Sequence, residues 1–353
     1  MITRKRFLTA LTAVALAVPL AACSSDETTA PAAGGDTATA SETPTLVMYS
    51  GRGEDLVDAL VPQLEELAGV NLEVRYGNTA ELAAQILEEG DRSPADIYFS
   101  QDAGALGAVA RAGLLAELDE DTLNLVPEAY QASDGTWVST SGRARVIVFN
   151  SEAVDEADVP DTIDALLDPE WRGKIGFAPT NASWQAFVTA LRVSRGEEGA
   201  REWLEAFRDN EPVRYEKNGA ILTAVEEGQV ELGLINHYYW YRLAVDQGLD
   251  NMRSQLKYLA PGDEGALVNI AGAGVLASSE NQEAAQRVVR AMLSLEAQEY
   301  FLDETSEYPL IDGLSVSEPG RPQLDELQGP DIDLADLESL EETQELLTQV
   351  GLL

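Results

Sequence analysis

The chain has 353 residues, of which 62 are acidic and 23 are Lys or Arg, so its formal net charge is −39. This acidity argues against nucleic-acid binding, which needs a basic surface, and it favours solubility and the attraction of cations. With one cysteine and one histidine, the chain cannot form an internal disulfide, a thiolate cluster for zinc or iron–sulfur, or a multi-histidine metal site.

The first residues have the pattern of a targeting segment. A basic stretch at residues 4–6 precedes an apolar stretch at residues 7–20, and the small residues that follow lead to Cys23. The sequence Leu-Ala-Ala-Cys resembles a bacterial lipobox, in which the cysteine is lipidated and becomes the mature N-terminus. We therefore expect residues 1–22 to be a lipoprotein signal peptide and residues 23–44, rich in Ala, Thr, Ser, Gly and Pro, to be a flexible tether. The alternative is a cleaved signal followed by an incidental free thiol.

This pattern predicts where the protein resides. No other apolar run is long enough to span a bilayer, so we expect a protein at the outer face of the cell membrane, held there only by its lipid anchor. Removing residues 1–22 takes away three basic and no acidic residues, which changes the charge to 20 − 62 = −42. We expect a monomer that does not bind nucleic acid.

Strand and helix patterns alternate through the rest of the chain. About 310 residues follow the tether, a length typical of two domains. Alternation of strands with helices predicts α/β lobes with parallel or mixed sheets flanked by helices. In the first unit, strand patterns occur at residues 45–50, 70–76 and 95–100, and helix patterns at 56–67, from 79 onward and at 103–113. In the second unit, strand patterns occur at residues 174–178, 214–215 and 230–235, and helix patterns at 183–193 and 219–227.

A long β-prone run at residues 137–150, broken at Ser141-Gly142, is predicted to connect the lobes. The strand pattern at 267–276 and the helix pattern at 280–293 are predicted to return to the first lobe. The acidic, amphipathic tail predicts a packed C-terminal helix with leucines 337, 340, 346 and 347 on one side. The expected boundaries are residues 45–145 plus 267–315 for lobe 1 and 146–266 plus 316–353 for lobe 2, with a hinge between them.

Residues 236–242 (Asn-His-Tyr-Tyr-Trp-Tyr-Arg) stand out because four of the seven are aromatic, whereas aromatic residues form 7% of the chain. They lie between a strand pattern and a helix pattern, at the turn where open α/β sheets usually bind ligands. Neighbouring residues point in different directions, so Tyr238 and Tyr239 are not both expected in the core. Two adjacent phenols at this edge predict a clamp of hard oxygen donors. The alternative is that the rings pack under a helix, which we favour for Trp240.

Three turns at the same predicted sheet edge precede helices: residues 179–183, residues 217–219 and Asn236. Each alone is an ordinary N-cap, but together they favour a bound oxyanion, because helix N-termini attract anions. Arg52, after the first strand, and Arg143, in the connection between the lobes, have the planar guanidinium groups that can bind an anion bidentately.

Eight motifs between residues 45 and 315 occur in an order that resembles the ferric-iron-binding proteins serving ABC importers. They are Tyr49-Ser50-Gly51-Arg52, Ser93-Pro94-Ala95-Asp96, Gly142-Arg143-Ala144-Arg145-Val146, Ala178-Pro179-Thr180-Asn181-Ala182-Ser183, Tyr215-Glu216-Lys217-Asn218, Asn236-His237-Tyr238-Tyr239, Ala271-Gly272-Ala273-Gly274-Val275 and Glu307-Tyr308-Pro309. The resemblance implies the two-lobe periplasmic binding protein fold. It also implies that the lobes close over one Fe(III) held by paired tyrosines and a synergistic anion.

By this resemblance, Tyr238 and Tyr239 are expected to be phenolate ligands of the metal. The expected anion subsite consists of Asn181, Ala182, Ser183, Asn218 and Asn236.

The sequence departs from part of that family. Gly53 and Gln101 stand where some members supply a histidine and a glutamate, and neither is a good ligand for Fe(III). Other members use a third tyrosine and an arginine-held carbonate, a pattern that Tyr49 and Arg52 fit. The expected set is therefore Tyr49, Tyr238 and Tyr239 with one or two carbonates or bicarbonates, held by Arg52 and Arg143. Two further residues have expected roles: Asp102 is a weaker candidate ligand, and His237 is expected to support the site.

The resulting expectation is a non-enzymatic, extracytoplasmic lipoprotein that captures Fe(III) and delivers it to the permease of an ABC importer. Fe(III) is a hard cation that prefers anionic oxygen donors. The alternative keeps the fold but binds a thiamine-like compound, a polyamine or an organic anion; a sensor lipoprotein also fits the sequence. An enzyme is not supported, because there is one histidine, no phosphate-binding glycine loop and no clustered carboxylate motif.

Overall fold

The computed structural model describes residues 43–353, so the predicted signal peptide, Cys23 and nearly all of the predicted tether lie outside the described residues. Within that range nine strands form one mixed sheet in the order β2-β1-β3-β9-β4-β7-β5-β6, and β8 pairs with β4. The strands are β1 (Thr45–Ser50), β2 (Asn71–Tyr76), β3 (Ile97–Ser100), β4 (Trp137–Asn150), β5 (Ile175–Phe177), β6 (Val213–Arg214), β7 (Leu232–Asn236), β8 (Ser254–Lys257) and β9 (Val268–Val275).

The sheet is parallel at both ends and antiparallel in the middle. β1 pairs in parallel with β2 and β3, and β5 pairs in parallel with β6 and β7. These are the strands that the alternating pattern predicted to be joined by helical crossovers. The central pairs of β9 with β3 and of β4 with β7, β8 and β9 are antiparallel.

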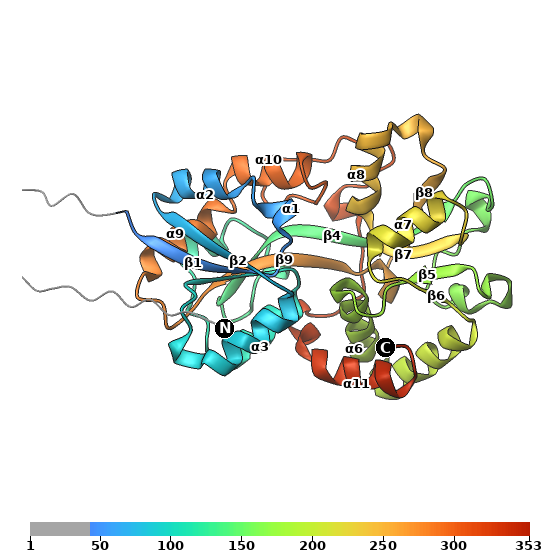
Figure 1. The fold of residues 1–353 in the computed structure, drawn as a ribbon, viewed down its shortest axis with the longest axis horizontal. Helices are drawn as coiled ribbons and strands as arrows, with labels where there is room; N and C mark the ends of the chain where they lie inside the picture. The colour runs from blue at the N-terminus through green and yellow to red at the C-terminus, as the bar shows by residue number, and fades with distance from the viewer. Residues whose placement is uncertain (1–42) are drawn as a thin grey trace, which may run out of the picture. The chain divides into compact units, whose positions relative to one another are not determined.

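Strand β4 joins two groups of strands. Residues 137–144 pair with β9, residues 145–149 pair with β7, and residues 147–150 pair with β8. All 14 residues of β4 are buried, including the polar residues Ser141, Arg143 and Arg145, which alternate along one face of the strand. The predicted break at Ser141-Gly142 corresponds to a register shift between Ser139 and Ser141. Figure 1 shows β4 and β9 side by side across the middle of the described part of the chain.

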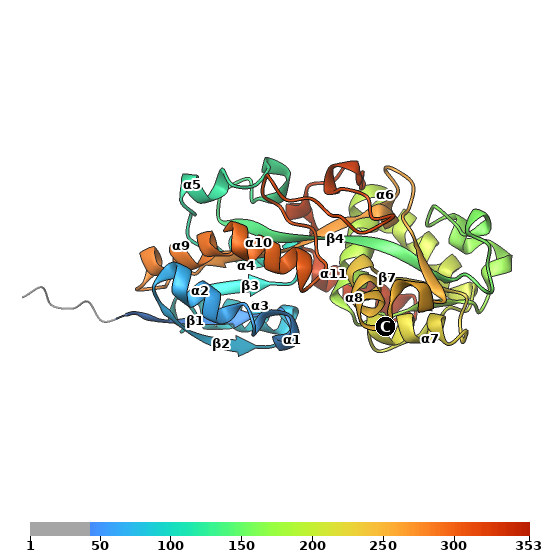
Figure 2. The same cartoon turned by 90° about the horizontal axis from the view of Figure 1, so that it is seen from above.

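Helices cover both groups of strands (Figures 1 and 2). In the first group, α2 lies against α9 and α3 lies against α4; in the second group, α7 and α8 cover β4 and β7. The helices are α1 (Glu54–Val57), α2 (Val61–Ala68), α3 (Thr79–Glu89), α4 (Ala103–Arg111), α5 (Glu120–Leu123), α6 (Ala182–Asp209), α7 (Asn218–Glu226), α8 (His237–Gln247), α9 (Gln282–Ala291), α10 (Leu295–Asp303) and α11 (Leu340–Gln349), with short 3-10 helices between them. Among these described residues, no helix combines the length and apolar character needed to cross a membrane.

Two helices differ from their predicted extents for identifiable reasons. The single helix expected at residues 56–67 is divided into α1 and α2, and Pro62 lies in the first turn of α2, where its missing N–H costs nothing. The helix expected at 183–193 extends to Asp209, with an interruption at Gly196, whose φ of 72° is left-handed.

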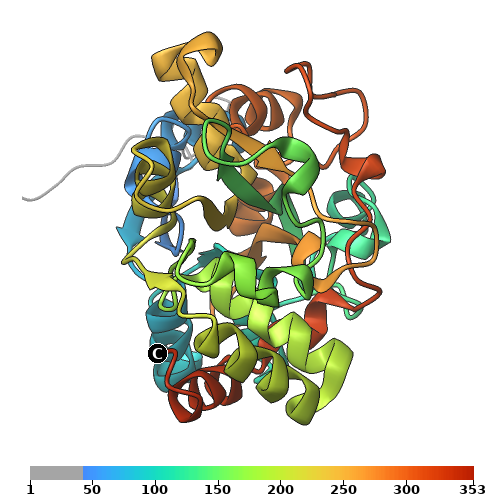
Figure 3. The ribbon, with the colours of Figure 1, turned by 90° about the vertical axis from the view of Figure 1, so that its right-hand side faces the viewer.

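The C-terminal segment contacts both groups of elements. The 3-10 helix η9 (Leu334–Glu338) lies against α4 and α6, and α11 lies against α6 (Figures 1 and 3). Arg192 of α6 donates to the backbone oxygen of Ser339 at 2.8 Å and to Thr343 Oγ1 at 2.9 Å. The packed C-terminal helix was predicted, but Leu337 precedes it, in η9. Residues 334–338 also reach α4 in the first group, which the sequence did not indicate.

Candidate functional site

The two predicted tyrosine ligands lie in the first turn of α8, directly after β7. The ring centroids of Tyr238 and Tyr239 are 4.3 Å apart, and the ring planes differ by 26°. The Tyr238 side chain is buried, with 2% of its surface exposed, whereas Tyr239 is half-buried. The helix begins at His237, so the tyrosines are part of the helix rather than of a preceding turn. The result is a pair of parallel phenols, one inside the protein and one at its edge.

Burial raises the pKa of Tyr238 well above its usual value, and Tyr239 raises it further. Arg143 and Arg52 oppose this shift, whereas Glu307 adds to it. The Tyr238 phenol is therefore protonated in the absence of a bound cation. A metal ion that binds its oxygen must displace that proton.

Arg52 is buried beside the tyrosine pair. Its Nη2 lies 2.7 Å from Glu307 Oε1, and neither side chain is exposed. The other carboxylate oxygen, Oε2, accepts a hydrogen bond from Ser141 Oγ at 2.6 Å. Burial lowers the pKa of Arg52, but Glu307 and the two phenols together raise it above the usual value. Nε and Nη1 of Arg52 have no hydrogen-bond partner, so two of its three nitrogens keep N–H donors that a ligand could use.

Arg143 adds a second buried guanidinium. Its Nη2 donates to the backbone oxygens of Gln101 and Ile270, the latter at 2.6 Å, while its Nε and Nη1 have no partner. Burial and the positive charge of Arg52 lower the pKa of Arg143. We call Tyr238, Tyr239, Arg52, Arg143 and Glu307 the tyrosine–arginine site. These five residues carry two guanidinium groups and one carboxylate, an excess of positive charge; Asp102, whose pKa burial raises, also interacts with Arg143.

The Arg52–Glu307 pair provides a stability prediction. Arg52→Met leaves the Glu307 carboxylate buried without its cation, which should lower the free energy of unfolding by about 3–5 kcal/mol. Arg52→Met combined with Glu307→Met should recover most of this loss, because no buried charge remains. Arg75→Met is the matched control, since its ion pair with Glu73 is exposed. Urea denaturation measures all three; equal stabilities of the single and double variants would contradict the prediction.

The predicted asparagines form a separate set at the N-termini of α6 and α7. The Asn181 side chain caps α6 by accepting from Ser183 N at 3.0 Å, and it also accepts from Ser183 Oγ at 2.6 Å. Asn218 Nδ2 donates to Ser183 Oγ at 3.0 Å, while Asn218 Oδ1 is buried without a partner. Ala182 is the first residue of α6. Asn236, at the end of β7, is buried and makes no capping bond to α8.

Arg145 belongs to this asparagine set, although the sequence did not single it out. Its Nη1 lies 3.3 Å from Ser183 Oγ, and its guanidinium lies over the rings of Trp184 and Phe187, 5.6 and 5.4 Å from their centroids. Burial lowers the pKa of Arg145 to about 9. The spacing Arg143-Ala144-Arg145 could have indicated Arg145 as a second site arginine, because alternate residues of a strand lie on the same face.

Tyr49 is not brought to the tyrosine pair. Its hydroxyl lies 3.2 Å from Glu89 Oε1 and 3.1 Å from Gln85 Nε2, on α3. Among the described contacts, no hydrogen bond or ring contact joins Tyr49 to Tyr238 or Tyr239. In this structure the Tyr49 side chain lies on the face of β1 that α3 covers, apart from the tyrosine pair.

The three other positions that were considered as metal ligands have structural roles. Gly53 precedes α1. The backbone N–H of Gln101 donates to Thr79 Oγ1 at 3.3 Å, and its backbone oxygen accepts from Arg143. Asp102 caps α4 by accepting from Ala105 N at 2.9 Å, and burial raises its pKa.

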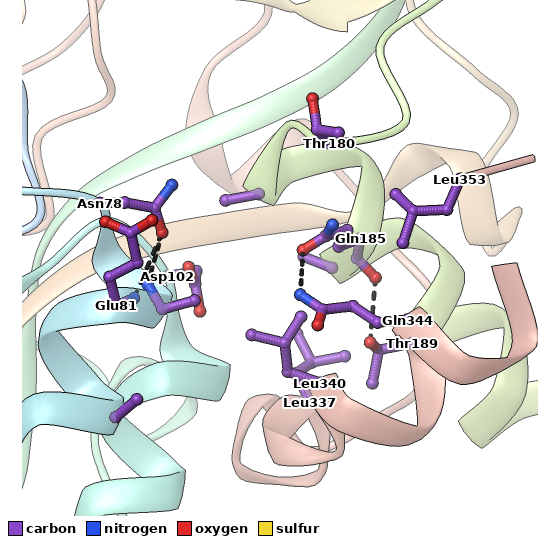
Figure 4. A pocket seen from close by; sticks show the side chains of 14 residues that line it. Asn78, Glu81, Asp102, Thr180, Gln185, Thr189, Leu337, Leu340, Gln344 and Leu353 are labelled. Atoms are coloured by element: carbon purple, nitrogen blue, oxygen red, sulfur yellow. Dashed lines mark hydrogen bonds between the residues drawn. The ribbon is translucent and has the colours of Figure 1, made fainter. Parts of the chain in front are cut away.

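A cavity of about 450 Å³ lies between α3 and α4 on one side and α6 and the C-terminal segment on the other. Figure 4 shows Asn78, Glu81 and Asp102 on the first side, and Gln185, Gln344, Leu337 and Leu340 on the second. Of the residues considered for the site, Ala182 and the weaker candidate Asp102 line it. The cavity therefore opens beside the start of α6 rather than around the tyrosines.

His237 is the first residue of α8, directly before the tyrosine pair. Its Nε2 lies 3.2 Å from Arg321 Nη2, and its Nδ1 lies 3.3 Å from the backbone oxygen of Ala144. Burial lowers the pKa of His237 well below its usual value, and Arg321 lowers it further. The imidazole is thus neutral with both nitrogens occupied, as the expected supporting role requires. Within residues 43–353, no group of three or more His, Cys, Asp or Glu side chains is arranged to hold a metal ion.

The site combines residues from both groups of strands, with Arg52 and Arg143 from the first and the tyrosine pair from the second, as in a two-lobed binding protein. A family model described as bacterial extracellular solute-binding protein matches residues 92–326. The Fe(3+)-binding periplasmic protein of Serratia marcescens is 34% identical over 309 residues, which cover 87% of this chain and 90% of that protein.

Solved structures agree with this match. The crystal structure of iron-bound HitA from Pseudomonas aeruginosa has a TM-score of 0.81 and 36% identity, and the match covers 87% of this chain and 99% of that one. A structure of Trichodesmium IdiA (FutA) in complex with iron and citrate ligands has a TM-score of 0.76 and 26% identity, over 88% and 100% of the two chains. The chain belongs to the family of bacterial extracellular solute-binding proteins. The predicted fold, and the prediction of a solute-binding protein rather than an enzyme, are confirmed.

Proposed function

We propose that this protein captures Fe(III) outside the cytoplasmic membrane and delivers it to the permease of an ABC importer. The observation that carries the proposal is the stacked pair Tyr238 and Tyr239 beside two buried arginines with unpartnered donors. Fe(III) prefers anionic oxygen ligands, and buried guanidinium groups stabilise the phenolates that such an ion requires. The relatives from Serratia marcescens and Pseudomonas aeruginosa, one named for Fe(3+) binding and the other solved with iron, support the same cargo.

A synergistic anion completes the proposed site. Nε and Nη1 of Arg52 and of Arg143 are unpartnered N–H donors, and charge-assisted hydrogen bonds from guanidinium groups bind oxyanions strongly. Carbonate or bicarbonate held there would neutralise the excess positive charge and offer its oxygens to the metal. The N-termini of α6 and α7, with Ala182, Asn181, Ser183, Asn218 and Asn236, form the second proposed anion subsite.

The proposal also covers the two lobes and the membrane anchor. Residues 45–145 plus 267–315 and residues 146–266 plus 316–353 form two lobes that close over the ion, with the C-terminal segment touching both. Residues 1–22 are a signal peptide, and a lipid on Cys23 anchors the monomeric carrier to the outer face of the membrane.

The experiment that tests the cargo is a titration of the protein with Fe(III) in bicarbonate buffer, followed by visible absorption. A phenolate-to-iron charge-transfer band that saturates at one ion per protein is the expected result. Absence of a band would favour the small organic ligand, which mass spectrometry of the material that co-purifies with the protein would identify.

Repeating the titration with Tyr49→Phe tests the ligand set. Because the Tyr49 hydroxyl is bound to Glu89 and Gln85, we expect the same band and an iron affinity within about a factor of two, corresponding to less than about 0.5 kcal/mol. A band of clearly lower intensity would show that Tyr49 reaches the metal after all.

A further inference from the structure

Arg321 lies behind the first turn of α8, in the segment between α10 and α11. Its side chain is fully buried and comes from a part of the sequence that gave no functional signal. Nη2 lies 3.2 Å from His237 Nε2 and 3.0 Å from the backbone oxygen of Ser306. Nη1 lies 2.8 Å from Glu318 Oε1. One guanidinium thus connects the start of α8 with the segment that follows α10.

Aromatic rings hold this guanidinium in place. Its central carbon lies 4.5 Å from the ring centroid of Tyr308 and 5.1 Å from that of Tyr241. The Tyr308 ring also stacks on His237, with centroids 4.6 Å apart. Cation–π contacts are strongest where the cation is removed from water, as Arg321 is here. Arg321 is therefore held by Tyr241, Tyr308, Glu318 and the Ser306 backbone as well as by His237.

The contact between Arg321 and His237 determines where the imidazole proton lies. An arginine can only donate, so Nε2 must accept and the single proton of a neutral ring must be on Nδ1. Nδ1 lies 3.2 Å from the backbone nitrogen and 3.3 Å from the backbone oxygen of Ala144. The Ala144 N–H at 3.2 Å would donate to an unprotonated Nδ1, whereas the Ala144 oxygen at 3.3 Å would accept from a protonated one, so the proton is assigned to Nδ1 on the Arg321 contact alone. His237 is then held on one side by Arg321 and on the other by β4.

This double attachment matters because α8 has no side-chain cap. Asn236 occupies the N-cap position without making a capping hydrogen bond, although such bonds usually fix the first turn of a helix. His237 is the first residue of α8, and the next two are the tyrosine pair. The orientation of that turn therefore depends on the His237 ring, and the ring depends on Arg321.

We propose that Arg321 is a positioning residue for the tyrosine pair: through His237 it holds the first turn of α8 where Tyr238 and Tyr239 can bind one metal ion together. It does not touch the ion. The assignment rests on the proposed function, because its consequence is the geometry of two phenolate ligands. Outer partners that orient metal ligands typically change metal affinity by about 10- to 100-fold when they are replaced.

The test compares Arg321→Met, which keeps the length and removes the donors, with Arg321→Lys, which keeps the charge but loses the planar fork. Arg195→Met is the matched control, because Arg195 is paired with Asp164 and Glu264, away from the tyrosines. Arg321→Met should release iron to a competing chelator about 10- to 100-fold faster and shift the maximum of the visible band. Arg321→Lys should lie between this variant and the unchanged protein, and Arg195→Met should match the unchanged protein.

A second measurement needs no iron. The chain has one histidine, so protein purified without a polyhistidine tag gives a single set of imidazole ¹⁵N resonances. The unchanged protein should show the proton on Nδ1, and Arg321→Met should lose this fixed tautomer. A proton on Nε2 in the unchanged protein would overturn the assignment, even if Arg321→Met does not fold.

The iron measurements distinguish a failure of the Arg321 role from a failure of the proposed function. A normal band in the unchanged protein, together with the same band and release rate in Arg321→Met, overturns the role of Arg321 and leaves the proposed function standing. Equal effects of Arg321→Met and Arg195→Met overturn it as well, because they indicate a general loss of stability. No band in the unchanged protein overturns the proposed function and this assignment with it.

Discussion

Replacing both Tyr238 and Tyr239 with phenylalanine is expected to abolish the visible charge-transfer band and to reduce Fe(III) binding below detection. The stacked rings, 4.3 Å apart, remain in the variant, but the two anionic oxygens that the ion requires are gone. The arginines then have excess positive charge with no phenolate to balance it, which further disfavours a trivalent cation. The measurement is the Fe(III) titration described above, with thermal unfolding to confirm the fold.

Tyr215→Phe is the matched control, because it makes the same chemical change at a half-buried tyrosine on a different element. It should leave the band unchanged. The single variants Tyr238→Phe and Tyr239→Phe should each keep a weaker, shifted band, since one phenolate remains. A double variant that still binds iron with a full band would refute the paired-phenolate site.

Acid is expected to release the iron steeply. Burial raises the pKa of Tyr238, so its phenol is protonated when the site is empty, and binding through two phenolates releases two protons. Protons therefore compete with the metal, and the affinity should fall by about 100-fold for each pH unit of acidification, tenfold for each proton displaced. The iron affinity therefore rises with pH: lower pH favours the protonated, empty site, and higher pH favours the loaded one.

Two measurements check this prediction. Iron retention in the presence of a fixed competitor, recorded over a pH series, gives the slope. A pH indicator in weakly buffered solution counts the protons released on loading, about two from the phenols, and bicarbonate can add its own. Release of less than one proton per ion would contradict ligation by both tyrosines.

Local patterns in the sequence were sufficient for most of the fold. The strand at residues 45–50 and the buried strand at residues 137–150 are observed with the predicted bounds, because period and β-branched composition specify such segments strongly. Chain order does not specify antiparallel pairing, so the central pairs of β4 with β7 and β9 were not predicted. The helical stretch after the break at Gly196 was also missed, because the predicted helix ended at Val193 and no second helix was expected before Asp209.

The candidate site was also predicted only in part. The tyrosine pair and Arg52 were identified from their places after strands, and the structure brings them together. Glu307, 255 positions from Arg52, could not be assigned as its partner, because no local pattern encodes so distant an ion pair. Tyr49 was expected at the site because, together with Arg52, it fits the pattern of family members that use a third tyrosine. Strand alternation gives the face on which a side chain lies but not the helix that covers this face, and here α3 supplies Glu89 and Gln85.

The attachment of the C-terminal segment has a mechanical consequence. Leu337 approaches α4 closely enough that its backbone oxygen would lie 2.2 Å from a side-chain carbon added at Gly104. Six residues later, Thr343 Oγ1 lies 2.7 Å from Thr189 Oγ1 of α6. Only Ser339 separates η9 from α11, so the connection between the α4 contact and the α6 contact is short and cannot lengthen. A movement that draws α4 and α6 apart must break one of these two contacts. The free-energy cost of breaking it favours conformations of the empty protein in which α4 and α6 stay together.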